Sequence, residues 1–236
     1  MAQNVSRRRF LRAGAAVAAT TVAAAAGRTS RAQGEQEPRK LKIIGVACSP
    51  RQGKTTAAAL QVCLDAAKAV APDSIEVELI ELAGLKIPGH LAAGLPLEPG
   101  EKDDFPAVAD KLGDPNVAGI IVGSPVYFCN MSALCKAFLD RCMVFRKNKF
   151  ALSGKVGGVV AVGGVRNGGQ ELTIQTVQAA LMCQEMTIVG DGKPTGHTGA
   201  TVWNNGKDDI TGDEFGISTC ENLGRRVAEV LLARRA

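Results

Sequence analysis

The stretch LKIIGVACSPRQGKTTAAALQVCLDAAKAV, residues 41–70, contains a strand pattern, a loop and a helix pattern in succession. LKIIGVA is a short apolar run rich in β-formers, and residues 54–70 form an Ala-rich helical run. The loop CSPRQGKTT follows the carboxyl end of this strand, where ligands bind in parallel α/β sheets. Its chemistry decides between two kinds of phosphate-binding fold.

The loop ends in Gly53, Lys54 and Thr55, as a Walker A phosphate loop does. A Walker A loop also has a glycine five positions before Gly53, and this chain has Cys48 there. Pro50 lacks the N–H that such a loop directs at a phosphate. No clear magnesium-binding aspartate follows the third or fourth predicted strand. The sequence therefore disfavours a nucleotide hydrolase.

A phosphate site of another kind fits the same residues. Ser49, Thr55 and Thr56 supply hydroxyl groups at a helix N-terminus, where a phosphate can bind without a metal. Arg51 adds a guanidinium group, and Gly53 permits a turn that a side chain would obstruct. The alternative is that Ser49 or Thr55 only caps the helix and binds no ligand.

Five apolar strand runs alternate with helical runs along the chain. The strand runs are LKIIGVA, IEVELIEL, VAGIIVGS, KVGGVVAVG and MTIVG. Helices are predicted at residues 54–70, 104–112, 131–146, 169–184 and 213–233. Nearly continuous apolar strands separated by helices indicate a parallel sheet covered on both faces. We therefore expect a doubly wound α/β domain whose ligand lies at the loops after the first, third and fourth strands.

These three loops carry recognisable motifs. SPRQGKTTAA, GSPVYFCNMSALCKAFLDR and VGGVRNGGQELTIQ, in this order, resemble the NADPH-dependent FMN reductase and iron–sulfur flavoprotein branch of the flavodoxin-like superfamily. The resemblance covers residues 41–233. It implies a flavodoxin-like, five-stranded parallel sheet of order 2-1-3-4-5 with helices on both faces. It also implies FMN as the cofactor and an FMN-dependent oxidoreductase that oxidises NAD(P)H and reduces a flavin, a quinone or another small acceptor.

The same resemblance assigns a part of the cofactor to each loop. The FMN phosphate would lie against Ser49, Arg51, Gln52, Gly53, Lys54, Thr55 and Thr56. The ribityl chain and the ring would lie along Pro125, Val126, Tyr127, Phe128, Cys129, Asn130 and Met131. The polar edge of the ring would face Gly163, Gly164, Arg166, Asn167, Gly168 and Gly169. No side chains look like an acid–base pair or a nucleophile, so the isoalloxazine itself is the expected reactive group and no catalytic residue is assigned.

The chain departs from the iron–sulfur flavoproteins in one loop. These proteins carry a compact cysteine cluster after the second strand, whereas LKIPGHLAAGLPLEPGEKDD contains no cysteine. We therefore predict no iron–sulfur cluster, and seven cysteines without a CxxC pair suggest no zinc site. Two other hypotheses stay open: an exported FMN electron carrier that docks to a redox partner, and a non-catalytic FMN-binding module. The donor would be NAD(P)H or a protein, the acceptor a small molecule or a protein, and the resemblance implies a homo-oligomer.

The first 32 residues are predicted to be an export signal. SRRRFLRAG places Arg7 and Arg8 before Phe10 and Leu11, an Ala-rich stretch follows, and the order resembles a twin-arginine signal. Its apolar part, residues 13–27, is shorter than the roughly 20 residues that cross a bilayer, so we expect no permanent membrane anchor. We expect a signal at residues 1–32, a polar linker at 33–40, a single domain at 41–236 and a periplasmic or other extracytoplasmic location.

The formal net charge of +5 originates in this signal. Six arginines and no acidic residue lie in residues 1–32, so 22 basic residues face 23 acidic ones in the rest of the chain. Without a basic excess, the chain is not expected to bind nucleic acid. Trp203 is expected in a polar loop, TVWNNGKDD, where it covers a flavin or a subunit interface or only anchors the loop.

Overall fold

The structure, a computed structural model, describes residues 39–235. The predicted signal peptide, residues 1–32, and most of the predicted linker, residues 33–40, lie outside the described residues. Among the helices that are described, none is both long enough and apolar enough to cross a membrane.

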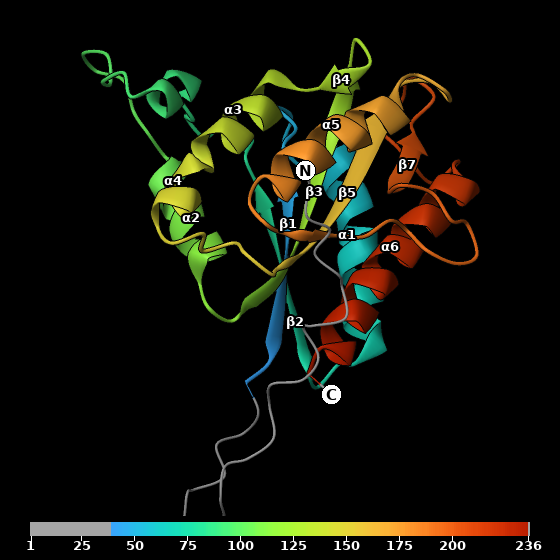
Figure 1. The fold of residues 1–236 in the computed structure, drawn as a ribbon. Helices are drawn as coiled ribbons and strands as arrows, with labels where there is room; N and C mark the ends of the chain where they lie inside the picture. Colours follow the sequence, from blue (N-terminus) through green and yellow to red (C-terminus); the bar gives the residue numbers. More distant parts are fainter. Residues whose placement is uncertain (1–38, 236) are drawn as a thin grey trace, which may run out of the picture. The chain divides into compact units, whose positions relative to one another are not determined.

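A central parallel sheet carries the fold (Figure 1). The strands along its main path are β1 (Leu41–Ala47), β2 (Ile75–Glu81), β3 (Val117–Tyr127), β5 (Val156–Gly163) and β6 (Thr187–Ile188). Their order is β2-β1-β3-β5-β6, and each neighbouring pair is parallel. Every residue of β5 is buried, as expected of a strand with helices on both faces. The predicted doubly wound fold and the order 2-1-3-4-5 are confirmed along this path.

Helices cover both faces of the sheet (Figure 1). One face carries α1 (Thr55–Val70) and α6 (Glu214–Ala233), and the other carries α2 (Phe105–Gly113), α3 (Ala133–Arg141), α4 (Met143–Lys147) and α5 (Gln170–Met182). Ile43 packs into the core under α1 and α6, whereas its neighbour Ile44 packs into the core on the opposite face. This alternation is the period of two of a strand, and it explains why the strand runs are apolar at almost every position.

The sheet has seven strands where five were predicted. The fifth position is shared by β6, which pairs with Val156 and Gly157, and β7 (Ala200–Trp203), which pairs with residues 160–163 of the same strand β5. The chain leaves the sheet between these two pieces and then returns to it. Each piece is too short to give a clear strand pattern, so the run MTIVG alone was predicted. Trp203 is therefore the last residue of a strand and not a loop residue.

Two other predicted boundaries were wrong. The predicted helix at 131–146 is divided into α3 and α4 at Cys142, although Phe138, Cys142 and Phe145 are all buried along both parts. The apolar stripe continues through the break, so the pattern could not reveal it.

The other wrong boundary is the end of β3. This strand was predicted to end at Ser124 but continues to Tyr127, and its last residues form a hairpin with β4 (Asn130–Met131), a strand that was not predicted. A short helix, η1 (Gly89–Ala93), lies in the long segment between β2 and α2.

Candidate functional site

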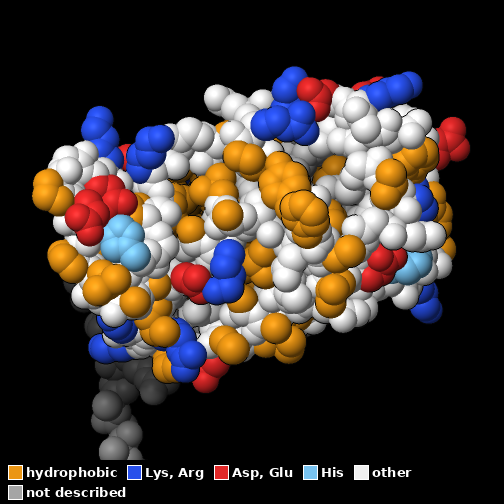
Figure 2. Space-filling model, turned by 90° about the horizontal axis from the view of Figure 1, so that it is seen from above, with side chains coloured by type: hydrophobic (Ala, Val, Ile, Leu, Met, Phe, Trp, Pro, Cys, Tyr) orange, Lys and Arg blue, Asp and Glu red, His pale blue; other side chains and the backbone are white. Residues whose placement is uncertain are grey.

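The loops that follow β1, β3 and β5 meet at the carboxyl edge of the sheet, because these strands are adjacent and parallel. Figure 2 shows this end of the molecule from above, with hydrophobic side chains across the middle of the face. The first two loops are joined by the Ser132 hydroxyl, which donates to the carbonyl oxygen of Cys48 at 2.7 Å. The backbone N–H of Ser132 in turn donates to the Ser124 hydroxyl at 3.0 Å. The structure thus brings the three predicted loops into one region.

The loop at residues 48–54 ends at an uncapped helix. The N-cap residue of α1 is Lys54, and no side chain of the described chain caps this N-terminus. Ser49 instead closes a tight local turn, because its hydroxyl oxygen accepts the N–H of Arg51 at 3.1 Å. Thr55 and Thr56 are buried in the first turn, whereas Arg51 is exposed. The capping alternative for Ser49 and Thr55 is therefore not what the structure shows, and the N–H groups of the first turn lack a side-chain cap.

Two carboxylates contact this loop. The Asp208 carboxylate lies 2.6 Å from the guanidinium of Arg51 and 3.1 Å from Nζ of Lys54. Hydrogen bonds from these two cations hold the pKa of Asp208 below its usual range, and the one from Lys54 has the larger effect. The N–H of Gly53 donates to the Glu81 carboxylate at the end of β2, at 2.7 Å. Gly53 has φ +64°, the left-handed region that favours glycine, but a β-carbon added to it would meet no heavy atom within 4 Å. The expectation that a side chain would obstruct this turn is therefore wrong, because glycine is favoured here by its backbone conformation and not by crowding. Gln52 is exposed.

The second predicted segment is a β-hairpin. Val126 pairs with Met131 and Tyr127 with Asn130, which leaves Phe128 and Cys129 as a two-residue turn. Both turn residues have positive φ, 50° and 60°, the conformation of a type I′ turn. Phe128 is fully exposed and Tyr127 is 46% exposed, so the tip presents aromatic surface to solvent. Pro125 and Val126 are half-buried below it.

The third loop is held against this hairpin. A β-carbon on Gly169, whose φ is +105°, would lie 2.5 Å from Cα of Cys129, so only glycine fits this contact. Gln170 organises the loop from below: its side chain accepts the N–H of Gly168 at 2.8 Å and donates to the carbonyl of Val165 at 2.7 Å. Gly163 is buried at the end of β5, while Gly164, Arg166 and Asn167 are exposed. Sequence reasoning did not select Gln170, since a buried glutamine at a helix start has no pattern of its own.

Arg166 has a structural partner. Its guanidinium pairs with Asp213, a buried carboxylate that also caps α6 by accepting the N–H of Gly216 at 2.9 Å. The same carboxylate accepts the N–H of Trp203 at 2.8 Å, and Arg166 lies over the indole ring at 5.5 Å. Arg166 therefore links the third loop to the end of β7 and to the N-terminus of α6.

The segment between β7 and α6, residues 204–212, is a fourth part of the site. Sequence reasoning offered the run TVWNNGKDD only through Trp203, with covering a flavin as one of three roles, and assigned none of residues 204–212 to the cofactor. Asn204 donates from its backbone N–H to the carbonyl of Gly163 at 3.0 Å, and its side chain reaches the Thr55 hydroxyl at 3.5 Å. Asp208 contacts the first loop, as described above. Since β7 ends at the same edge as β5, the polar run NNGKDD would have indicated the segment if that strand had been recognised.

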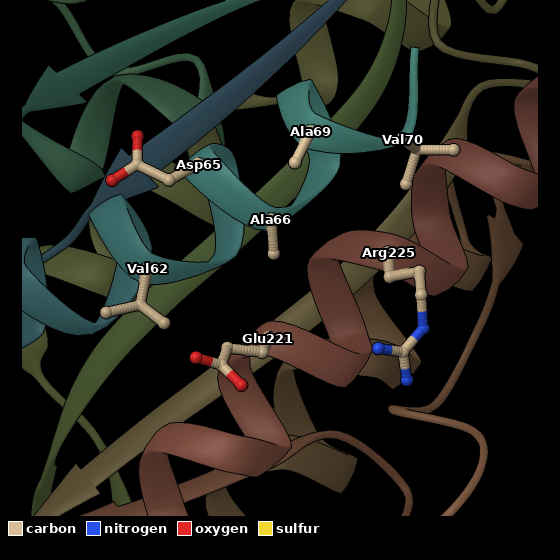
Figure 3. A pocket seen from close by; sticks show the side chains of 7 residues that line it. All are labelled: Val62, Asp65, Ala66, Ala69, Val70, Glu221 and Arg225. Atoms are coloured by element: carbon tan, nitrogen blue, oxygen red, sulfur yellow. The ribbon is translucent and has the colours of Figure 1, made fainter. Parts of the chain in front are cut away.

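A groove elsewhere on the surface does not belong to this site. Figure 3 shows it between α1 and α6, where Val62 and Ala66 face Glu221 and Arg225. None of the predicted site residues lines it. Within residues 39–235, no group of three or more His, Cys, Asp or Glu side chains is arranged to hold a metal ion.

Comparisons with known proteins agree on the family. Residues 41–200 match the family described as NADPH-dependent FMN reductase. An iron-sulfur flavoprotein of Methanocaldococcus jannaschii is 40% identical over 195 residues, covering 81% of this chain and 97% of the relative. The iron-sulfur flavoprotein of Methanosarcina thermophila is 31% identical over 194 residues, covering 81% of this chain and 95% of the relative.

Solved structures of more distant proteins share the fold. An apo NADH:FMN oxidoreductase superposes with a TM-score of 0.57 at 20% identity, covering 81% of this chain and 90% of that one. A flavodoxin, WrbA-like protein from Agrobacterium tumefaciens gives a TM-score of 0.54 at 16% identity, covering 82% of this chain and 98% of that one. The doubly wound fold that the strand pattern predicted is therefore of the flavodoxin-like type, as the likeness to these structures shows.

Proposed function

The chain belongs to the NADPH-dependent FMN reductase family, and from this premise we propose that the four segments at the carboxyl edge hold its FMN. Membership makes the protein an FMN-dependent oxidoreductase.

The uncapped N-terminus of α1 is the observation that carries the proposal. Helix N–H groups without a side-chain cap attract an anion, and the helix dipole adds to this attraction. Arg51 and Lys54 supply positive charge at the same place, and the hydroxyl groups of Thr55 and Thr56 lie in the first helical turn. These groups suit a phosphate monoester, so the FMN phosphate belongs here.

The other segments suit the flavin ring. The exposed aromatic surface of Tyr127 and Phe128 can cover a face of the ring, and the glycine-rich loop before α5 brings backbone N–H groups close to its polar edge. Bound FMN supplies the redox chemistry by accepting a hydride or electrons and passing them on. The side chains of the chain bind and orient the cofactor, and the ion pair of Arg166 with Asp213 fixes the position of the third loop.

The test of this function is the cofactor content and reactivity of the purified protein. We expect a yellow protein that releases FMN, and not FAD, on denaturation. Under anaerobic conditions, NADPH or NADH should bleach the flavin absorption. A protein that neither contains FMN nor binds added FMN would overturn the assignment, and a flavin that NAD(P)H does not reduce would favour an electron carrier with a protein donor.

The same preparation tests the prediction that iron is absent. The similar archaeal proteins are named iron-sulfur flavoproteins, but residues 82–104 of this chain contain no cysteine. We expect no iron by metal analysis. Stoichiometric iron would mean that cysteines elsewhere in the chain hold a cluster.

We also propose that the protein is exported by the twin-arginine route and acts as a homo-oligomer. SRRRFLRAG supports the first part, and the exposed side chains of Phe128, Val165 and Leu172 on neighbouring segments support the second. Replacing Arg7 and Arg8 by lysine should leave unprocessed, flavin-loaded protein in the cytoplasm. Undiminished export of that variant would remove the assignment, and a monomer in light scattering would remove the homo-oligomer.

A further inference from the structure

The donors of the proposed phosphate loop are held by carboxylates of the same chain. Asp208 takes one cation on each of its oxygens, Arg51 at 2.6 Å and Lys54 at 3.1 Å. Glu81 takes the N–H of Gly53 at 2.7 Å. Asp208 lies in the 204–212 segment and Glu81 at the end of β2, so two separate parts of the chain place a carboxylate against this loop.

A carboxylate and a phosphate cannot both use these donors without cost. Arg51, Lys54 and Asp208 are each between 43% and 52% exposed, and ion pairs between exposed side chains are weak. A dianionic phosphate at a helix N-terminus gains the helix N–H groups in addition to the same cations. The phosphate is therefore expected to displace the carboxylates from these donors. Each displaced carboxylate stays nearby and repels the phosphate.

We infer that Asp208 and Glu81 act as internal stand-ins for the cofactor phosphate, which competes with them for the donors of the loop at residues 51–54. This inference rests on the proposed FMN site. Both acidic residues then oppose FMN binding, and they reduce the preference of the protein for FMN over riboflavin. Riboflavin lacks the phosphate and leaves the pairs in place.

The isosteric substitutions Asp208→Asn and Glu81→Gln test this inference. Each removes one negative charge and keeps an oxygen that can accept a hydrogen bond. In titrations of the cofactor-free protein, each should raise the affinity for FMN about two- to fivefold and leave the affinity for riboflavin unchanged. Inorganic phosphate should likewise raise the melting temperature of either variant more than that of the parent.

Asp209→Asn is the matched control. Asp209 is adjacent to Asp208 and carries the same charge, but its carboxylate accepts hydrogen bonds from Thr211. Its substitution should change FMN affinity by less than that of Asp208. If Asp208→Asn and Asp209→Asn raised the affinity for FMN equally, only the total charge of the segment would matter. That result would contradict competition between Asp208 and the phosphate.

Failure of the inference and failure of the proposed site give different results. If Arg51→Ala weakens FMN and riboflavin equally, the phosphate does not bind at this loop, and the proposed site and the inference both fall. If Arg51→Ala weakens FMN alone while Asp208→Asn and Glu81→Gln leave FMN affinity unchanged or lower it, the site stands. In that case the carboxylates orient the donors, and the inference that they compete with the phosphate is wrong.

Discussion

At the scale of single residues, the tip of the β3–β4 hairpin is in an unfavourable conformation. A type I′ turn needs positive φ at both central residues and favours Asn-Gly, but this chain has Phe128 and Cys129 there. The left-handed region costs a residue other than glycine roughly 1–2 kcal/mol. Phe128 recovers none of this through burial, because its side chain is fully exposed. Strain at an exposed aromatic residue is expected where a ligand or partner uses that residue.

The double substitution Phe128→Asn with Cys129→Gly should therefore stabilise the protein. We expect the free energy of unfolding of the cofactor-free protein to rise by about 1 kcal/mol, since the turn strain is relieved and little buried surface is lost. FMN affinity should fall, because the aromatic surface is removed. Urea denaturation and FMN titration measure the two effects. Phe128→Ala is the control: it removes the ring, keeps the strained backbone at Cys129, and should weaken FMN binding without stabilising the fold. A double variant with the same free energy of unfolding as the parent would contradict the claim that this turn is strained.

At the scale of elements, the sequence predicted what depends on buried strands and on local turn chemistry. The parallel sheet and the loops after β1, β3 and β5 follow from apolar runs that the structure buries, whereas the strand order was expected from the family resemblance. The split fifth position could not be predicted, because β6 has two residues and β7 has four. For the same reason, Asn204 and Asp208 in the segment at 204–212 were not assigned to the site, although the run was named for Trp203. The contacts of Gln170 and Asp213 depend on tertiary structure, which a local pattern does not contain.

The long segment between β2 and α2 is fastened to α3 by one ion pair. Arg141 makes two hydrogen bonds to the Asp103 carboxylate, at 2.9 and 2.7 Å, and a third to the carbonyl oxygen of Pro88 at 3.3 Å. It also lies over the ring of Phe105 at 4.7 Å. Both charged side chains are mostly buried, and Arg141 holds the pKa of Asp103 below its usual range.

Asp103→Asn should therefore destabilise the protein in a pH-dependent way. The depressed pKa means that the pair contributes stability above the unfolded pKa, near pH 4, and loses it as the pH falls through the folded pKa. We expect a loss of about 1–3 kcal/mol at pH 7 and a much smaller one near pH 2. Urea denaturation of both proteins at a series of pH values measures this. Asp110→Asn, a position on α2 outside this ion pair, is the control for the charge change. A loss that is equal at pH 7 and pH 2 would contradict the account.

At the scale of the whole molecule, four segments far apart in sequence converge on one edge of the sheet. Ser132 joins the first two loops, Gly169 brings the third against the hairpin, and Asn204 joins the fourth to both β5 and α1. The two faces of the sheet are closed by helices, so the polar and aromatic groups of the site gather at the strand ends. The central claim is that this edge binds FMN through its phosphate at the start of α1.

The most direct test of this claim compares two ligands that differ only in the phosphate. Dissociation constants for FMN and riboflavin should be measured on the cofactor-free parent and on the variants Arg51→Ala and Thr55→Ala. A charge-assisted hydrogen bond is worth about 1.5–3 kcal/mol, so each substitution should weaken FMN binding by roughly one to two powers of ten. Riboflavin should bind about equally to all three proteins. Equal losses for FMN and riboflavin would contradict the claim and would show that residues 49–56 do not hold the phosphate.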